Sequence, residues 1–150
     1  MPAQVGAALR EIGTKLLDAA REAQAYGLAA VHIGCVAPVA VISIVPPPGR
    51  DYRVLFNPRV IETGGISIPG REGSVSMPGI ELEITRPDFV RIGFDDKAGA
   101  AVELELTGFP ARVAQHEIDQ VNGIFFLNRL SRLKRETAIK RYAKLTRRMG

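Results

Sequence analysis

The sequence contains very little cysteine and histidine. Its 150 residues include one cysteine, Cys35, and two histidines, His32 and His116. A single cysteine excludes an internal disulfide and is typical of a reducing compartment, so we expect a cytoplasmic location. No apolar run is long enough to span a bilayer, and the charged first helix does not have the pattern of a signal peptide, so we expect no membrane partner.

Acidic residues are nearly absent from the C-terminal end of the chain. Residues 129–150 contain nine Lys or Arg and one acid, a net charge of +8, whereas the whole chain carries +4. Such a basic segment is typical either of a solvated helix face or of a segment that binds a polyanion.

The spacing of apolar residues predicts a single α+β domain over residues 1–150, with no repeat and no linker. Spacings of three and four predict helices at 5–23, at 110–123 and, strongly basic, at about 133–150. Gly27 is expected to end the first helix. Apolar runs and alternation predict strands at 38–45, 52–57, 80–85, 90–94 and 102–106. Residues 64–79, rich in Gly, Pro and Ser, are predicted to be mostly loop, and residues 95–100 the loop of a hairpin.

The second predicted helix contains the stretch QHEIDQVNG at 115–123. His116 and Gln120 are four residues apart and therefore share one helix face, with Glu117 beside them. The stretch differs from the metal-binding pattern HExxH at its last position, where Gln120 replaces the second histidine. Alone, a His-Glu pair is more often part of an ordinary helix face than of a metal site.

Three stretches, in this order, resemble the three motifs of peptide deformylases. YGLAAVHIG (26–34), REGSVSMPG (71–79) and QHEIDQVNG (115–123) are similar to GxGLAAxQ, EGCLS and QHExDHxxG. Other stretches resemble that family as well, so the resemblance covers nearly the whole chain: FNP, ITRP, VRIGFDDKAG, ELTGFPARVAQHE and FLNRLSRLKR. It implies the α+β fold of that family, with antiparallel or mixed strands around the central HExx(Q) helix and a C-terminal helix.

The resemblance implies an activity and a metal site. The family removes the formyl group from the N-terminal formyl-methionine of nascent chains. The Cys of EGCLS and both His of HExxH hold a divalent metal, often iron, and the Glu is the general base. Carried over by position, the metal ligands fall at Ser74, His116 and Gln120, and the general base at Glu117.

The first two motifs carry the remaining site positions that the resemblance implies. His32 and the Val75 N–H stand where the family has its oxyanion donors, and His32 replaces a Gln. Gly27, Leu28 and Gly73 stand at positions that bind the substrate.

Two of the three ligand positions carry weaker donors for a first-row metal. A Cys thiol ionises near pH ~8.5, and lower beside a metal, whereas the hydroxyl of Ser74 stays neutral. The Gln120 carbonyl is a hard neutral oxygen that suits Ca²⁺ or Mg²⁺ better than Fe or Zn. We therefore expect no tightly held cofactor, at most a weakly bound Fe, Zn or Ni ion, and impaired catalysis.

Both histidines fall at motif positions, which leaves an alternative open. His32 can replace a lost ligand and form, with His116 and Glu117, a two-His-one-carboxylate metal set of an active deformylase. The simpler hypothesis is that His32 forms a hydrogen bond in a vacated pocket.

The resemblance also suggests partners. The leading hypothesis is a catalytically impaired homologue that binds N-terminal peptides of nascent chains. In the family the C-terminal helix docks on the ribosome near the tunnel exit, which fits the basic residues 133–150, so ribosomal RNA is a second expected partner. The family's N-terminal segment is missing from the sequence, and a sheet edge exposed in this way favours a homodimer.

Overall fold

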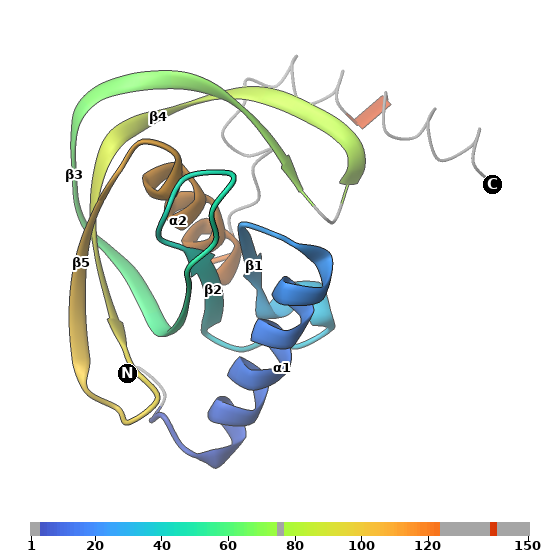
Figure 1. Ribbon diagram of the computed structural model, residues 1–150, viewed down its shortest axis with the longest axis vertical. Helices are drawn as coiled ribbons and strands as arrows, with labels where there is room; N and C mark the ends of the chain where they lie inside the picture. The colour runs from blue at the N-terminus through green and yellow to red at the C-terminus, as the bar shows by residue number, and fades with distance from the viewer. Residues whose placement is uncertain (1–3, 75–76, 124–138, 141–150) are drawn as a thin grey trace.

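The computed structural model describes residues 4–74, 77–123 and 139–140 (Figure 1). The elements follow in the order α1 (Ala7–Ala23), β1 (Gly27–Ala29), the 3-10 helix η1 (Ala30–Ile33), β2 (Val39–Ser43), β3 (Tyr52–Ser74), β4 (Met77–Asp95), β5 (Ala101–Thr107) and α2 (Gly108–Val121). The predicted basic helix at about 133–150 lies outside the described residues, apart from residues 139–140, which are helical.

The described strands form one antiparallel sheet of five strands in the order β1-β2-β3-β4-β5. In Figure 1 the long β3–β4 ribbon curves around α2, and α1 lies next to β1. Helix α1 also packs against the first residues of β3. The predicted α+β fold with strands around the central helix is therefore confirmed.

The prediction of a loop at 64–79 is wrong, because most of these residues belong to the β3–β4 ribbon. The two strands pair from Phe56 opposite Asp95 to Ser74 opposite Met77, with four register shifts on the way. One of these shifts, between Gly64 and Ser67, includes Gly65 with a φ of +72°, a conformation that glycine adopts without strain. Gly65 therefore lies in an irregularity of the ladder, whereas Pro69 and Gly70 pair in register with Thr85 and Ile84.

The end of α1 also differs from the prediction. The helix ends at Ala23, and Gln24 takes the left-handed conformation with a φ of +55°. Its N–H reaches the carbonyls of Ala20 and Arg21, which closes the last turn. Gly27, expected to end the helix, is instead the first residue of β1.

The two helices cover opposite faces of the sheet. All five residues of β2 are buried. Val41 packs in a cluster with Leu16 of α1, whereas its neighbour Ile42 packs in a second cluster with Ile118 of α2. Because successive strand residues point to opposite faces, a strand covered on both faces is mainly apolar. The polar residue of β2, Ser43, donates its hydroxyl to the Val45 carbonyl and accepts from the Asp51 N–H. This second cluster anchors α2, which carries the third motif.

We predict that Gly13→Ala destabilises the protein although alanine favours a helix. A Cβ at Gly13 would lie 2.7 Å from Phe56 Cζ and 3.1 Å from Val54 Cγ1. Overpacking costs about 1–3 kcal/mol, which offsets the gain in helix propensity of about 1 kcal/mol. Urea unfolding of the wild type and the variant measures the difference. A Gly13→Ala protein as stable as the wild type would show that Phe56 repacks freely.

Candidate active site

The fold brings the three motifs together at one face of α2. His116, Glu117 and Gln120 are 8%, 6% and 4% exposed. Helix α2 packs against β1 and η1, which carry the first motif. The second motif begins at the end of β3, where Glu72 contacts His116. The side chain of Ser74 and the whole of Val75 lie outside the described part of the chain.

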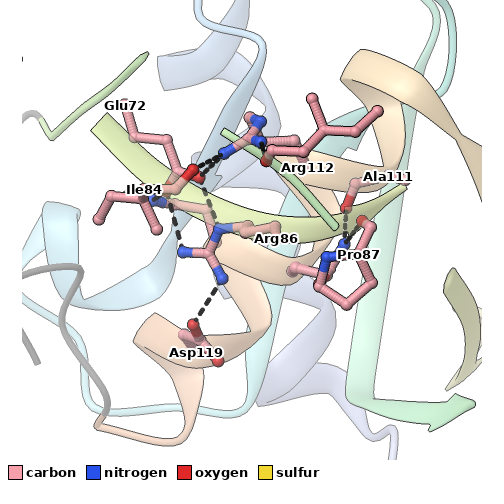
Figure 2. A network of polar contacts seen from close by, with 10 residues as sticks. Glu72, Ile84, Arg86, Pro87, Ala111, Arg112 and Asp119 are labelled. Atoms are coloured by element: carbon pink, nitrogen blue, oxygen red, sulfur yellow. Dashed lines mark hydrogen bonds and ion pairs between the residues drawn. The ribbon is translucent and has the colours of Figure 1, made fainter. Parts of the chain in front are cut away.

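A buried carboxylate, Glu72, is the centre of the polar contacts (Figure 2). Arg86 of β4 donates to it twice, from Nε to Oε2 at 2.6 Å and from Nη2 to Oε1 at 2.9 Å. Arg112 of α2 donates from Nη1 to Oε2 at 2.6 Å. Arg86 also donates from Nη1 to Asp119 Oδ2 at 3.0 Å. Burial alone would raise the pKa of Glu72, but the hydrogen bonds from His116 and Arg86 and their charges lower the pKa to about 2.

The same carboxylate orients the His116 ring. Nδ1 of His116 lies 2.9 Å from Glu72 Oε1. Because Glu72 is ionised, Nδ1 donates and carries a proton, so Nε2 is the ring atom able to bind a ligand. Burial lowers the pKa of His116, but the hydrogen bond to Glu72 and the charges of Glu117 and Glu72 outweigh burial and raise it.

Glu117 lies directly against the backbone of β1. A Cβ built on Gly27 would stand 2.8 Å from both Cγ and Oε2 of Glu117 and 2.7 Å from Val113 Cγ1, so glycine permits this close approach. Among the described residues, Oε1 of Glu117 has no hydrogen-bond partner. Burial raises the pKa of Glu117 to about 7, against the lowering effect of the His116 charge. A carboxyl group with such a pKa can take or give a proton near neutral pH.

His32 is held in one tautomer by the backbone. The Ala29 N–H donates to Nδ1 of His32 at 3.0 Å. Burial and the charge of His116 lower the pKa of His32, which favours the neutral ring. With Nδ1 as acceptor, the proton of the neutral ring sits on Nε2, which is buried and has no partner within the described part of the chain. In this tautomer His32 offers an N–H, like the Gln amide it replaces, and no lone pair for a metal.

Two of the three predicted ligand side chains, the imidazole of His116 and the amide of Gln120, lie in the described part of the chain. No group of three His, Cys, Asp or Glu side chains among the described residues could hold a metal ion. At the position of the second motif histidine, Gln120 is 4% exposed, and neither Oε1 nor Nε2 finds a hydrogen-bond partner within those residues. A neutral amide is a poor substitute for an imidazole at an Fe or Zn centre.

A pocket of about 170 Å³ opens beside these side chains. Its walls are formed by Tyr26, Gly27, Arg71, Glu72, Gly73, Phe109, Arg112, Val113, His116 and Glu117. Tyr26 and Phe109 meet edge to face with ring centroids 5.2 Å apart, and the guanidinium of Arg50 lies 4.3 Å above the Tyr26 ring. Of the three positions expected to bind substrate, Gly27 and Gly73 form part of the wall. Leu28 packs instead in the core against α1.

Sequence reasoning missed the residues that support the site. Glu72 and Asp119 are letters of the second and third motifs, so the motifs themselves could have drawn attention to them. Arg86 and Arg112 lie in stretches that resemble the family, ITRP and PARVAQHE, yet nothing local in those stretches shows that both side chains meet one carboxylate.

Known proteins that resemble this chain identify its family. The sequence profile described as polypeptide deformylase matches residues 2–136. The chain belongs to this family. A peptide deformylase-like protein of Rhizobium meliloti strain 1021 is 43% identical over 139 residues, which cover 93% of this chain and 80% of the relative. A peptide deformylase of Aquifex aeolicus is 40% identical over 134 residues, covering 87% of this chain and 78% of the relative.

Solved structures of polypeptide deformylases share the fold. The crystal structure of the peptide deformylase from Thermus thermophilus superimposes with a TM-score of 0.85 and 34% identity, covering 98% of this chain and 87% of that one. The enzyme from Ehrlichia chaffeensis gives a TM-score of 0.84 with 28% identity, covering 96% and 86%. Within the described residues, no helix is long and apolar enough to cross a membrane.

We predict that Glu72→Gln lowers the unfolding free energy by about 3–5 kcal/mol at neutral pH, because Arg86, Arg112 and His116 all lose their buried carboxylate and Asp119 remains a partner of Arg86 alone. Glu72 has a pKa of about 2, below its ordinary 4.5, so its ionised form stabilises the fold above pH 4.5. This contribution is lost as the pH falls from 4.5 through 2. The unfolding free energies of wild type and variant, measured in urea, should therefore differ most at neutral pH. The two values should converge as the pH falls towards 2, the pKa of Glu72.

The matched control is Glu105→Gln. Glu105 also accepts from an arginine, Arg91, at 2.9 Å, but its side chain is 60% exposed. Exposed pairs contribute about 0–1 kcal/mol, so little change is expected. An equal effect of the two variants would mean that the buried network contributes no more than a surface pair.

Proposed function

We propose that this member of the polypeptide deformylase family binds N-terminal peptides of nascent chains in the pocket beside His116 and Glu117, and that its centre holds no first-row metal tightly. Deformylation is then slow or absent. The observation that carries the proposal is Gln120, a buried neutral amide at the position where the third motif has its second histidine.

The described site supports peptide binding without a metal. Glu72 orients His116 by a direct hydrogen bond, so this side chain is placed by the protein alone. The pocket beside it has two aromatic side chains in its wall, Tyr26 and Phe109, which suit an apolar side chain of a peptide.

An active hydrolase with a rebuilt metal site is the second candidate. It is favoured by two buried atoms, His32 Nε2 and Glu117 Oε1, that have no hydrogen-bond partner among the described residues. This set would require His32 to move its proton to Nδ1 and to give up the hydrogen bond from Ala29. It would also use Glu117 as a ligand and thereby remove the general base.

The proposal includes two further partners and a location. The basic residues 129–150, with a net charge of +8, are proposed to contact ribosomal RNA. The edge strands of the described sheet are β1 and β5, and an unpaired edge is a surface on which two copies can form a homodimer. The single cysteine fits the reducing cytoplasm.

We predict that the purified chain contains far less than one Fe, Zn or Ni ion per molecule and does not measurably deformylate a formyl-Met peptide. Ser74→Cys with Gln120→His restores thiolate and imidazole at the ligand positions, and this double variant should bind one divalent metal. Each single variant should bind poorly, because two good ligands hold a transition metal weakly. Metal analysis and deformylation of a formyl-Met peptide measure the two effects.

The matched control combines Ser74→Cys with Gln115→His. Gln115 is also a buried residue of α2, but its amide donates to the carbonyls of Pro87 and Ala111, away from the predicted ligand positions. This control should gain no metal. One tightly bound metal in the wild type, lost on His32→Gln, would overturn the proposal in favour of the rebuilt site.

We predict that the chain binds RNA or ribosomes at low salt with an affinity that falls steeply as salt rises. Neutralising phosphates with Lys and Arg releases counterions, so log K falls linearly with log salt. Replacing the basic residues of 129–150 by Gln should flatten the slope, whereas Arg10→Gln with Lys15→Gln on α1 should not. Co-sedimentation with ribosomes across a series of salt concentrations measures this slope. An unchanged slope would mean that the C-terminal segment is only a solvated face.

A further inference from the structure

Arg112 ties helix α2 to both strands of the β3–β4 ribbon. Its Nη1 donates to Glu72 Oε2 at 2.6 Å and to the Ile84 carbonyl at 2.8 Å, and its Nη2 donates to the Ile68 carbonyl. Ile68 and Glu72 belong to β3, and Ile84 belongs to β4. In Figure 2 the Arg112 guanidinium lies beside both Glu72 and Ile84.

A glycine on β3 makes room for this contact. A Cβ built on Gly70 would lie 2.7 Å from Cζ, 2.8 Å from Nε and 2.9 Å from Nη2 of Arg112. Gly70 pairs with Ile84, whose carbonyl accepts from the same guanidinium. The planar group therefore lies close against the backbone of β3, where three hydrogen bonds hold it, so a side chain at Gly70 would displace it and strain these bonds.

The contact from Arg112 helps to hold Glu72 in its orientation towards His116, together with the two hydrogen bonds from Arg86. Oε2 of Glu72 accepts from Arg112 and Arg86, while Oε1 accepts from His116 and from a second nitrogen of Arg86. With both oxygens held, the carboxylate has one orientation, and that orientation places the His116 ring. Arg112 also forms part of the wall of the pocket that contains His116 and Glu117.

We propose that Arg112 is a positioning residue, which fixes the His116 ring through Glu72 and holds the end of β3 against α2. Its effect on peptide affinity rests on the proposed function, whereas its effect on the ring does not. A lysine cannot replace it fully, because an ammonium group lacks the planar fork that reaches a carboxylate and two carbonyls at once.

The ring signals of His116 test the proposal directly. The chain has only two histidines, so ¹⁵N-histidine labelling gives two rings, which His32→Gln assigns. At constant pH, Arg112→Ala should move the His116 Nδ1 signal from that of a carboxylate-bound N–H towards that of a free ring, with the His32 ring unchanged. Arg112→Lys should lie between Arg112→Ala and wild type. The control Arg91→Ala removes an arginine of the same sheet that pairs with exposed carboxylates, and should leave His116 unchanged.

A double-mutant cycle with Gly70→Ala tests the same contact from the other side and keeps every charge. Gly70→Ala should displace the guanidinium and shift His116 as Arg112→Ala does, yet add nothing when Arg112 is already alanine. Affinity for a formyl-Met peptide should fall about tenfold in each single variant and about tenfold, not hundredfold, in the double variant, because contacting residues are not additive.

Three results separate the outcomes. A wild-type His116 signal in Arg112→Ala, with only a lower melting temperature, would overturn the positioning role and leave a purely structural one. Additive effects of Gly70→Ala and Arg112→Ala would overturn it as well. If the wild type binds no peptide, the proposed function fails, while the His116 ring signals still decide the role of Arg112.

Discussion

A single buried carboxylate constrains the geometry of the site. Glu72 is 6% exposed, and an ionised carboxylate at such a depth is stable only when several donors compensate for the lost water. Its donors come from β4, through Arg86, and from α2, through Arg112 and His116. The ribbon, the helix and the ring thus have to meet at one point. Moving any of them would leave the buried carboxylate with fewer donors than its depth requires.

This arrangement separates the placement of His116 from the presence of a metal. In metal sites, a carboxylate that accepts from a ligating histidine fixes its ring and tautomer. Here Glu72 performs this task although Gln120 stands at the second histidine position. The carboxylate that orients His116 is therefore in place whatever residue stands at the second ligand position. A chain with Glu72 and His116 in place but other residues at the ligand positions would retain the preformed pocket beside His116. This is the basis of the proposed function.

The candidate site was predictable in part, since three motifs in a fixed order are enough to indicate the family. The positions of His32, His116, Glu117 and Gln120 follow from those motifs. What the side chains do there does not follow. His32 is an N–H donor because Ala29 occupies its Nδ1, and Leu28 packs in the core because β1 faces α1. The tautomer of His32 and the burial of Leu28 both depend on neighbours that β1 and η1 bring into contact. A motif does not describe such neighbours.

The sequence by itself determined the helices at α1 and α2, the buried strand β2 and the alternating strand β5, because apolar periodicity is a local property. Only the tertiary structure decided that residues 64–74 and 77–95 form one long ribbon. There, pairing between distant residues outweighs the local preference of Gly and Pro for loops. The meeting of Arg86 and Arg112 at Glu72 was likewise decided by the fold, since the two arginines lie 14 and 40 positions from that carboxylate. Spacing in the chain does not encode contacts of that kind.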